Sequence, residues 1–354
     1  MSQSSKEVSV VIATYNGEKY ILNQLESIRN QTREPDEVII VDDRSKDATY
    51  TIVMEYINHY TLENWKVYLN EKNLGYKKNF QKGIELASGK FIFLCDQDDE
   101  WETNKIELMT RVMIENPKIQ ALNCGVRLVD GDSKEIVCKP SKNMYNCGFL
   151  YSQHPVGEIT YYTYPYLLKH NISPGCTMVI TQQLRSDFLD TYGCELPHDW
   201  HLNLLASVNL GCAFYNRPLV KYRQHGNNAI GANNGFVKGI TSRTRRHRIQ
   251  SCADKENTSN NILTYYHKKN GKDMKQFDVE LHTDELERTL KWNASYKRFF
   301  ESPSLTRLVN LYKFSEYRET TRVHIRIWNI IIALRLDDVV IKIVTHAQRE
   351  KSKL

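Results

Sequence analysis

Short apolar runs alternate with segments of helical periodicity over the first hundred residues, and this alternation restricts the possible folds more than any other feature. The apolar runs, which have the length and composition of buried strands, are residues 8–14, 37–41, 65–69 and 91–94. Helical spacing of apolar residues separates these runs at 20–31, 47–60 and 77–87. This order predicts an α/β fold with a mixed, mainly parallel sheet and helices on both of its faces.

The pattern is less regular after residue 100. We expect helices at 104–115 and 199–210, and strands at 119–129, 178–181 and 219–222. Residues 226–262 are rich in Gly, Asn, Ser and Arg, which is typical of a linker. The prediction is therefore a main domain of residues 1–232, a basic linker of residues 233–262 and a helical C-terminal region of residues 263–354.

The end of that helical region, residues 323–344, mixes Ile and Val runs with charged side chains. Such a segment favours docking on an anionic membrane surface, and dimerisation or docking on the main domain is the alternative. No apolar run approaches the roughly 18 residues that a membrane-spanning helix needs. The sequence therefore predicts at most a peripheral association with a membrane.

The net charge of +6 is unevenly distributed. Residues 1–237 carry a net charge of −4, and the remaining residues carry +10. The arginines at 243–248 leave a nucleic-acid-binding protein as a distant alternative. We expect no nucleic acid partner, because the sheet domain is acidic and would repel phosphate groups unless a cation were bound.

The eight cysteines are spread along the chain without a CxxC pair, and the N-terminal residues lack the pattern of a signal peptide. Spread-out cysteines in a chain of this size are typical of reduced thiols in the cytosol. We therefore expect a cytoplasmic protein.

Carboxylates follow two of the predicted strands at the point where each strand ends. Asp42 and Asp43 follow the second strand, and Asp96, Asp98 and Asp99 follow the fourth. Ligands of parallel α/β sheets bind outside the carboxyl ends of the strands, so these acids should meet at one edge. In an extended segment the side chains of Asp96 and Asp98 lie on the same side and can share a hard divalent ion such as Mg²⁺ or Mn²⁺.

Six motifs in this order resemble those of family 2 glycosyltransferases, which have the glycosyltransferase A fold and bind nucleotide-sugars. The matching segments are VSVVIATYNGEKYILNQLESIRNQT, EVIIVDDRSKD, NLGYKKNFQKGIELASGKFIFLCDQDDEW, SPGCTMVI, LPHDWHLNLLA and KYRQHGNNAIG, which cover roughly residues 7–232. The segments DQDDEW and YRQHGNN further resemble bacterial rhamnosyltransferases of cell-wall or O-antigen polysaccharide synthesis.

The resemblance implies a donor site at the ends of the first, second and fourth strands. Thr14 and Tyr15 would lie at the donor, with Tyr15 stacked on the nucleotide base, and Asp43 would accept a hydrogen bond from that base. Asp96 would face the ribose and a metal-bound water, and Asp98 would bind the metal beneath the diphosphate.

The second half of the matching region would supply the remaining groups. Asp199, in LPHDWHLN, occupies the position of the family's general base, and the helix that starts here should lower its pKa. The competing interpretation is that Asp199 only caps this helix. His225 would complete the metal or phosphate site, and Arg223 could pair with the diphosphate.

These roles imply an inverting glycosyltransferase that acts by a metal-assisted single displacement. Its partners would be a nucleotide-diphosphate sugar, best dTDP-rhamnose, and a glycan or lipid-linked glycan acceptor at the inner face of the plasma membrane. A UDP-sugar donor is the alternative within the family. A nucleotidyltransferase is disfavoured because the loop TYNGEKY has one glycine instead of a glycine-rich phosphate loop.

Overall fold

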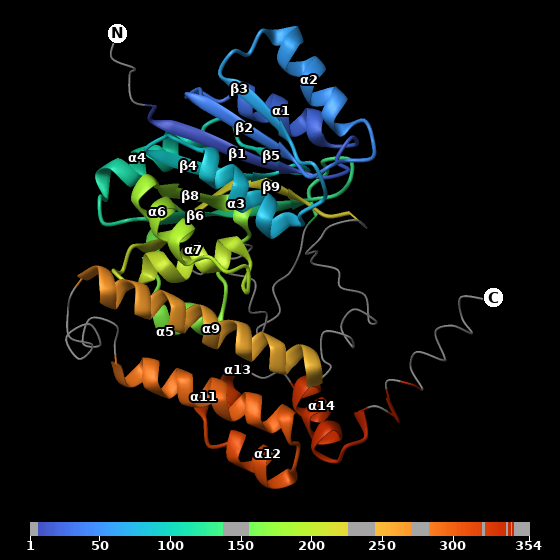
Figure 1. Cartoon of the computed structure of the whole chain (residues 1–354), viewed down its shortest axis with the longest axis vertical. Coiled ribbons are helices and arrows are strands. Elements are labelled where there is room, and N and C mark those ends of the chain that lie inside the picture. Colours follow the sequence, from blue (N-terminus) through green and yellow to red (C-terminus); the bar gives the residue numbers. More distant parts are fainter. Residues whose placement is uncertain are drawn as a thin grey trace.

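The computed structural model of the chain contains a sheet domain and a helical region that lies against it (Figure 1). The structure describes residues 6–136, 156–225, 245–270, 283–320, 323–337, 339–340 and 342. The N-terminal two-thirds form the sheet domain, and the helices from residue 245 onwards form the second part, as Figure 1 shows.

The sheet has nine strands among the described residues, in the order β3-β2-β1-β4-β8-β6-β9-β5, with β7 paired to β9. Strands β1 (Val8–Thr14), β2 (Glu37–Asp42), β3 (Trp65–Leu69) and β4 (Phe91–Asp96) are parallel. Strand β8 (Met178–Thr181) runs antiparallel between β4 and β6 (Ala121–Val129), and the remaining strands are β5 (Glu100–Trp101), β7 (Ile159–Tyr161) and β9 (Cys212–Arg223). The predicted mixed, mainly parallel α/β sheet is confirmed.

Helices cover both faces of this sheet because its central strands are apolar on both sides. On one face, Val10 and Ile12 of β1 pack with α1 (Ile21–Arg29), α2 (Thr49–Tyr60) and α4 (Lys105–Glu115). On the other face, Val11 and Ala13 of β1 pack with α3 (Tyr76–Leu86), α6 (Gln182–Thr191) and α7 (His198–Ser207). Consecutive side chains of a strand point to opposite faces, so a continuous apolar run serves both layers.

Strand β9 is longer than the sequence predicts, because Pro218 lies inside it. The pairing of β9 with β6 shifts register on both sides of Gly125, where Arg217 and Pro218 pass close to the glycine. A Cβ atom at Gly125 would lie 3.1 Å from the carbonyl oxygen of Arg217. The irregularity accommodates proline inside a strand, and it explains why only the second half of β9 is recognisable from the pattern.

The helical region begins earlier than predicted. Helix α9 (Arg245–Asn270) occupies much of the expected linker, so the linker boundary at residue 262 is wrong. Its sequence is polar with little amphipathic character, but Ile262 and Tyr266 are buried in the core of the sheet domain. Tyr164, in helix α5 (Tyr164–Lys169), donates a hydrogen bond to Ser259 at 2.9 Å. Tertiary contacts therefore stabilise a helix that the periodicity does not reveal.

The other helices of this region are α11 (Thr283–Glu301), α12 (Leu305–Leu311), α13 (Ser315–Thr320) and α14 (Val323–Ala333). Helix α11 packs beside α9, and the two run side by side in Figure 1. A separate apolar core joins these helices around Phe299, Phe300, Tyr317 and Ile332. None of the helices in the described part of the chain is long and apolar enough to cross a bilayer.

The six cysteines that the structure describes are free thiols, and five of them are buried. The expectation of reduced cysteines therefore agrees with the described residues. Cys138 and Cys147 lie outside them.

Candidate active site

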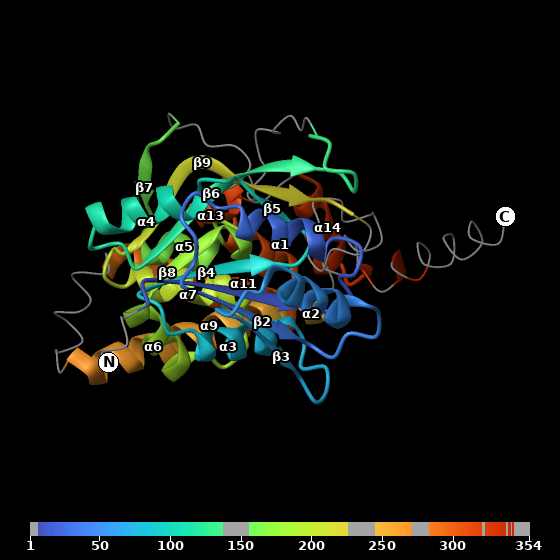
Figure 2. The same ribbon diagram turned by 90° about the horizontal axis from the view of Figure 1, so that it is seen from above.

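The ends of β1, β2 and β4 meet at one edge of the sheet. In the parallel register, Thr14 lies beside Asp42 and Ala13 lies beside Asp96. Figure 2 shows these strands running side by side towards the same edge. The segments that follow them therefore lie together, as expected for residues after adjacent parallel strands.

Gln97 joins two of these segments through a pair of hydrogen bonds to Tyr15. The backbone N–H of Tyr15 donates to Oε1 of Gln97 at 2.7 Å, and Nε2 of Gln97 donates to the carbonyl oxygen of Tyr15 at 2.9 Å. A Cβ atom at Gly17 would lie 2.3 Å from Oε1 of Gln97, so this contact requires glycine. The ring of Tyr15 is exposed, which leaves it accessible for the predicted stacking on a base.

Asp42 is buried and stabilises the segments after β1 and β2 from within. Its carboxylate accepts hydrogen bonds from the hydroxyl of Thr14 at 2.9 Å and from the backbone N–H of Ser45 at 2.8 Å. Thr14 is itself buried, so its side chain faces Asp42 and not the solvent. The predicted donor contact at Thr14 would therefore have to come from its backbone.

Asp43 is also buried, and both of its carboxylate oxygens are used by the loop before α3. Oδ1 accepts from the backbone N–H of Leu74 at 2.7 Å and from Asn70 at 2.8 Å, and Oδ2 accepts from the backbone N–H of Gly75 at 2.8 Å. Gly75 has a positive φ of 80°, which favours glycine. Asp43 thus positions this loop, and its predicted contact with a nucleotide base stays a prediction.

Asp96 lies at the centre of the acidic edge. Burial and the negative charges of Asp98 and Asp199 together raise the pKa of Asp96 to about 7. One acid close in sequence and one acid from a distant helix therefore act on the same carboxyl group. The structure thus brings together Asp96, Asp98 and Asp199, which the sequence assigns to donor, metal and base roles.

Asp98 and His225 are neighbours although they are far apart in sequence. Nε2 of His225 lies 2.7 Å from Oδ2 of Asp98, and both side chains are partly exposed. Carboxylate oxygens with an imidazole nitrogen suit Mn²⁺, and carboxylates suit Mg²⁺. The mutual repulsion at Asp96 shows excess negative charge, which a divalent cation would relieve. The residues present therefore fit the predicted metal.

A second group of possible ligands lies deeper, with atoms of Asp96, Asp99 and Cys176 within 4.8 Å of one another. Burial raises the pKa of the Cys176 thiol well above its usual value, so the thiol stays protonated. A protonated thiol is a poor ligand for Mg²⁺ or Mn²⁺. We therefore favour Asp98 and His225 over this buried set.

Arg223 differs from the prediction, because its guanidinium group is fully buried and does not face the open edge. It pairs with Glu100 and donates hydrogen bonds to the carbonyl oxygens of Asp98 at 2.8 Å and Asp130 at 3.0 Å. The backbone N–H of Arg223 donates to Asp99 at 3.0 Å. The expected ion pair with a diphosphate is therefore corrected to a positioning role for the segment that carries Asp98.

Asp199 lies in the first turn of α7 and is buried. Burial raises its pKa to about 6, whereas hydrogen bonds from Asn171 and from backbone N–H groups act in the opposite direction. Nδ2 of Asn171 donates to Oδ2 of Asp199 at 2.7 Å. The expected lowering of this pKa is wrong, because burial outweighs the helix N-terminus. Pro197 and not Asp199 precedes the helix, so Asp199 is not its N-cap.

The two histidines that flank Asp199 are structural. The ring of His198 stacks on Phe80 with centroids 3.9 Å apart, and His201 lies 3.0 Å from the hydroxyl of Thr191. Burial lowers the pKa of each histidine to about 3, so both are neutral. Gly175 allows a close approach of the backbone to the ring of His198, since a Cβ atom there would lie 2.5 Å from Nε2 of His198.

Sequence reasoning did not single out Gln97, Glu100 or Asn171. Gln97 and Glu100 lie within the acidic motif after β4, so their position in the motif could have identified them as site residues. Asn171 is part of an Asn-Ile-Ser sequence that carries no signal of its own. Its contact with Asp199 depends on how α5 packs against α7.

The family profile described as Glycosyl transferase family 2 matches residues 9–179. A relative from Haemophilus influenzae, an uncharacterized glycosyltransferase, is 28% identical over 325 residues, which are 88% of this chain and 90% of the relative. The dTDP-rhamnosyl transferase RfbG of Shigella flexneri is 30% identical over 239 residues, which are 64% of this chain and 75% of the relative.

Among solved structures, TarS residues 1–349 of S. aureus in complex with UDP-GlcNAc has a TM-score of 0.52. The match covers 90% of this chain and 93% of the TarS chain, with 18% sequence identity. This similarity shows that the fold is shared, including much of the helical region.

Proposed function

Because the chain belongs to glycosyl transferase family 2, we propose that it transfers a sugar from a nucleotide-diphosphate donor to a glycan hydroxyl with inversion at the anomeric carbon. The observation that carries this proposal is the convergence of charge on Asp96, whose pKa responds to both Asp98 and Asp199. Acids from the predicted donor edge of the sheet and from helix α7 are therefore close enough to interact electrostatically.

Asp199 is the proposed general base. A pKa of about 6 keeps its carboxylate mostly ionised at neutral pH and makes it a stronger base than an ordinary Asp. Asn171 donates to one carboxylate oxygen at 2.7 Å, which orients the carboxylate that would receive the proton of the acceptor hydroxyl. We assign no carboxylate of the site as a nucleophile, and a single base without a nucleophile supports a single displacement with inversion.

Asp98 and His225 are the proposed ligands of Mg²⁺ or Mn²⁺. When bound, the ion neutralises the charge of the diphosphate leaving group. Arg223 and Glu100 position the segment that carries Asp98, because Arg223 donates to the carbonyl oxygen of Asp98 and pairs with Glu100. Tyr15 and the backbone of Thr14 complete the donor side, and Gln97 holds their segment in place.

We propose L-rhamnose from dTDP-rhamnose as the donor and a polysaccharide of the bacterial cell envelope as the product. Two observations support this choice, namely the segments DQDDEW and YRQHGNN and the similarity to the Shigella flexneri dTDP-rhamnosyl transferase. A UDP-sugar is the alternative donor within the same family. No single side chain at the described edge distinguishes the two donors.

A lipid-linked acceptor at the inner face of the plasma membrane is the proposed setting. Exposed aliphatic side chains support it, with Ile327 and Ile330 on α14, Leu334 directly after this helix, and Leu305 and Val309 on α12. The two helices pack together and carry exposed basic residues nearby, which suits an anionic lipid surface. A second copy of the chain is the alternative partner of this surface.

Little supports nucleic acid binding by the arginines at 243–248. Arg245 forms an ion pair with Asp337 at 2.9 Å, and Arg248 donates a hydrogen bond to the hydroxyl of Tyr296 at 2.6 Å. Only Arg246 of the arginines that the structure describes in this stretch is exposed, and Arg243 lies outside the described residues. A single exposed arginine is a weak footprint for a phosphate backbone.

A panel of nucleotide-sugars with Mn²⁺ tests the proposed function by thermal shift and by transfer to glycan acceptors. We expect dTDP-rhamnose to raise the unfolding temperature and to be consumed, with UDP-GlcNAc as the comparison donor. Asp199→Asn should retain the thermal shift and lose transfer. Transfer by this variant at the wild-type rate would refute the assignment of the base.

A further inference from the structure

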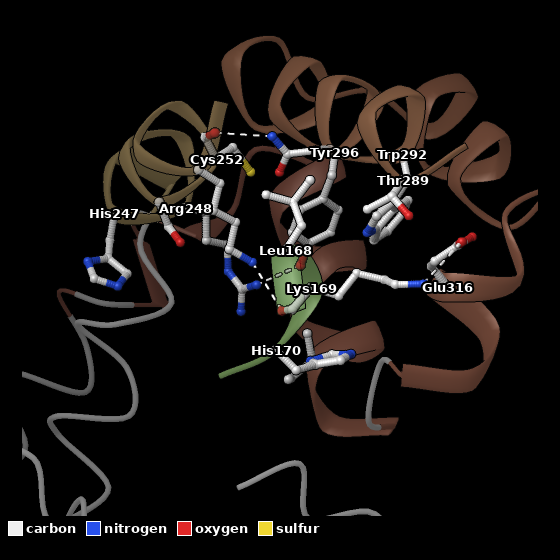
Figure 3. Close-up of a pocket in the computed structure, with 14 residues that line it drawn as sticks. Leu168, Lys169, His170, His247, Arg248, Cys252, Thr289, Trp292, Tyr296 and Glu316 are labelled. Atoms are coloured by element: carbon white, nitrogen blue, oxygen red, sulfur yellow. Dashed lines mark hydrogen bonds and ion pairs between the residues drawn. The ribbon is translucent and has the colours of Figure 1, made fainter. Parts of the chain in front are cut away.

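A cavity of about 370 Å³ lies between the sheet domain and the helical region (Figure 3). Its walls are the end of α5, the first half of α9 and the middle of α11, with Glu316 of α13 at one side. Figure 3 shows Arg248, Lys169 and His170 around the centre of the cavity, with Trp292 and Tyr296 above them. None of the residues assigned above to the donor, the metal or the base lines this cavity.

The cavity collects positive charge that the protein itself does not neutralise. Arg248 donates to the hydroxyl of Tyr296, but its Nε is buried without a hydrogen-bond partner. Lys255 donates to the carbonyl oxygen of Lys169 at 3.2 Å. Within the part of the chain that the structure describes, neither Arg248 nor Lys255 forms an ion pair with a carboxylate. Two partly buried cations therefore lack a counter-charge, which is costly unless a ligand supplies one.

The acids nearby are engaged with other cations. Glu316 pairs with Arg288 at 3.2 Å and lies 4.0 Å from Lys169, which also pairs with Glu285 at 3.3 Å. Burial lowers the pKa of Lys255 to about 8, so this lysine is still mostly protonated at neutral pH. The cavity thus has unmatched positive charge on the α9 side and balanced charge on the α13 side.

An aromatic wall adjoins these cations. The rings of Trp292 and Tyr296 lie with centroids 4.7 Å apart, and both residues line the cavity. Aromatic side chains with a few well-placed polar groups are typical of small-molecule sites. This combination suits a ligand with an anionic group next to an apolar face, such as a sugar ring that carries a phosphate.

The cavity is connected to the proposed base through two short paths. His170 lines the cavity, and the next residue, Asn171, donates to Asp199. Lys255 lies over the ring of Trp200, 4.8 Å from its centroid, and Trp200 follows Asp199 in α7. The cavity is therefore on the Asp199 side of the domain, which is the side that an acceptor must approach.

We propose that this cavity binds a phosphate group of the acceptor, through Arg248 and Lys255. The proposal rests on the glycosyltransferase function, since it specifies the acceptor as a phosphate-bearing glycan. The phosphate could belong to the diphosphate that joins a glycan to its lipid carrier or to a phosphodiester within the glycan. Both sources present the same tetrahedral anion to the two cations, and charged groups recognise it by charge-assisted hydrogen bonds.

The first test measures pyrophosphate binding to the full-length protein by calorimetry, without divalent metal and in the Asp98→Ala background. These conditions remove the metal-dependent donor site, so the measurement does not depend on catalysis. We expect Arg248→Gln and Lys255→Gln each to weaken binding by about tenfold or more, the scale of one lost charge-assisted hydrogen bond. Arg246→Gln removes the same charge from an exposed position on α9 and should leave the affinity unchanged.

Wild-type affinity in both cavity variants would overturn the proposal, as would equal weakening by Arg246→Gln. Arg248→Lys keeps the charge and should retain most of the binding, which separates a binding defect from a folding defect. Thermal unfolding of each variant provides the second check on folding.

The second test measures transfer kinetics with three acceptors that share one terminal sugar. One is a neutral glycan, one carries an internal phosphodiester and one is joined to a lipid by a diphosphate. We expect Lys255→Gln to raise KM for at least one phosphate-bearing acceptor and to leave KM for the neutral glycan unchanged. The acceptor that is affected identifies the source of the phosphate, and an equal KM change for all three would contradict the proposal. Inactive wild-type protein would instead count against the glycosyltransferase function, and pyrophosphate binding would still test the cavity.

Discussion

Asn171→Ala should move the pH dependence of transfer towards higher pH. The side chain of Asn171 donates a hydrogen bond of 2.7 Å to the carboxylate of Asp199, and this bond favours the ionised form. A hydrogen bond to a charged group contributes about 1.5–3 kcal/mol, and each pKa unit corresponds to about 1.4 kcal/mol. Loss of the bond should therefore raise the pKa of Asp199 from about 6 to about 7–8.

The direction of the effect follows from the role of the carboxylate. A general base acts only when deprotonated, so activity rises with pH through the pKa of Asp199. At pH 7 the ionised fraction should fall from about nine-tenths to between about one-half and one-tenth. The rate at pH 7 should therefore fall about two- to tenfold, and it should recover by about pH 9.

The assay is the initial rate of transfer between pH 5 and pH 9.5 at saturating donor and acceptor. Asn203→Ala is a matched control, because Asn203 donates to Oδ1 of Asn171 at 3.3 Å and is not bonded to Asp199. Asn203→Ala should reduce stability without moving the pH profile. Asn171→Asp should move the profile further than Asn171→Ala, because it adds a negative charge beside Asp199. A rate that is lower at every pH, while the pH at which activity rises stays at the wild-type value, would refute the reasoning.

Three further predictions concern the donor edge. Asp98→Ala should abolish stimulation by Mn²⁺ while the thermal unfolding temperature stays within a few degrees of wild type, and full activity in EDTA would contradict the metal role. Gly17→Val should displace Gln97 and raise KM for the donor more than it lowers kcat, and Gln97→Ala should reproduce the change. Arg223→Gln should destabilise the protein by about 1.5–3 kcal/mol, since Glu100 keeps Lys221 but loses its buried cationic partner and the carbonyl oxygens of Asp98 and Asp130 lose a charged donor, and denaturant unfolding should detect this loss. An unfolding free energy equal to that of wild type would rule out the positioning role.

Much of the sheet could be predicted because its strands and helices are encoded by local periodicity. The strands expected at residues 8–14, 65–69 and 178–181 have the same bounds in the structure. Strand β9 and helix α9 were predicted poorly for a shared reason, namely that neither is stabilised by its own pattern. Pro218 interrupts the pattern of β9, and α9 is a polar helix held by contacts with the sheet domain.

The candidate site was predictable as a location and less so in its chemistry. Asp96, Asp98 and Asp199 were assigned from motifs, and the structure brings their charges together. Arg223 was misassigned, because a basic residue in a motif does not reveal whether its guanidinium group faces a ligand or the interior. The pKa of Asp199 was given the wrong direction, since burial depends on the whole of the surrounding fold.

By itself the sequence determined that parallel strands would end in acids at one edge, because strand direction and side-chain alternation are local properties of the chain. Tertiary structure alone decided that Arg223 would point inward, that Asn171 would hold Asp199 and that Arg248 and Lys255 would share a cavity. These outcomes depend on the packing of segments that lie far apart in sequence. The sequence pattern carries no direct information about such contacts. The proposed chemistry nevertheless depends on them, because they bring the charged groups together.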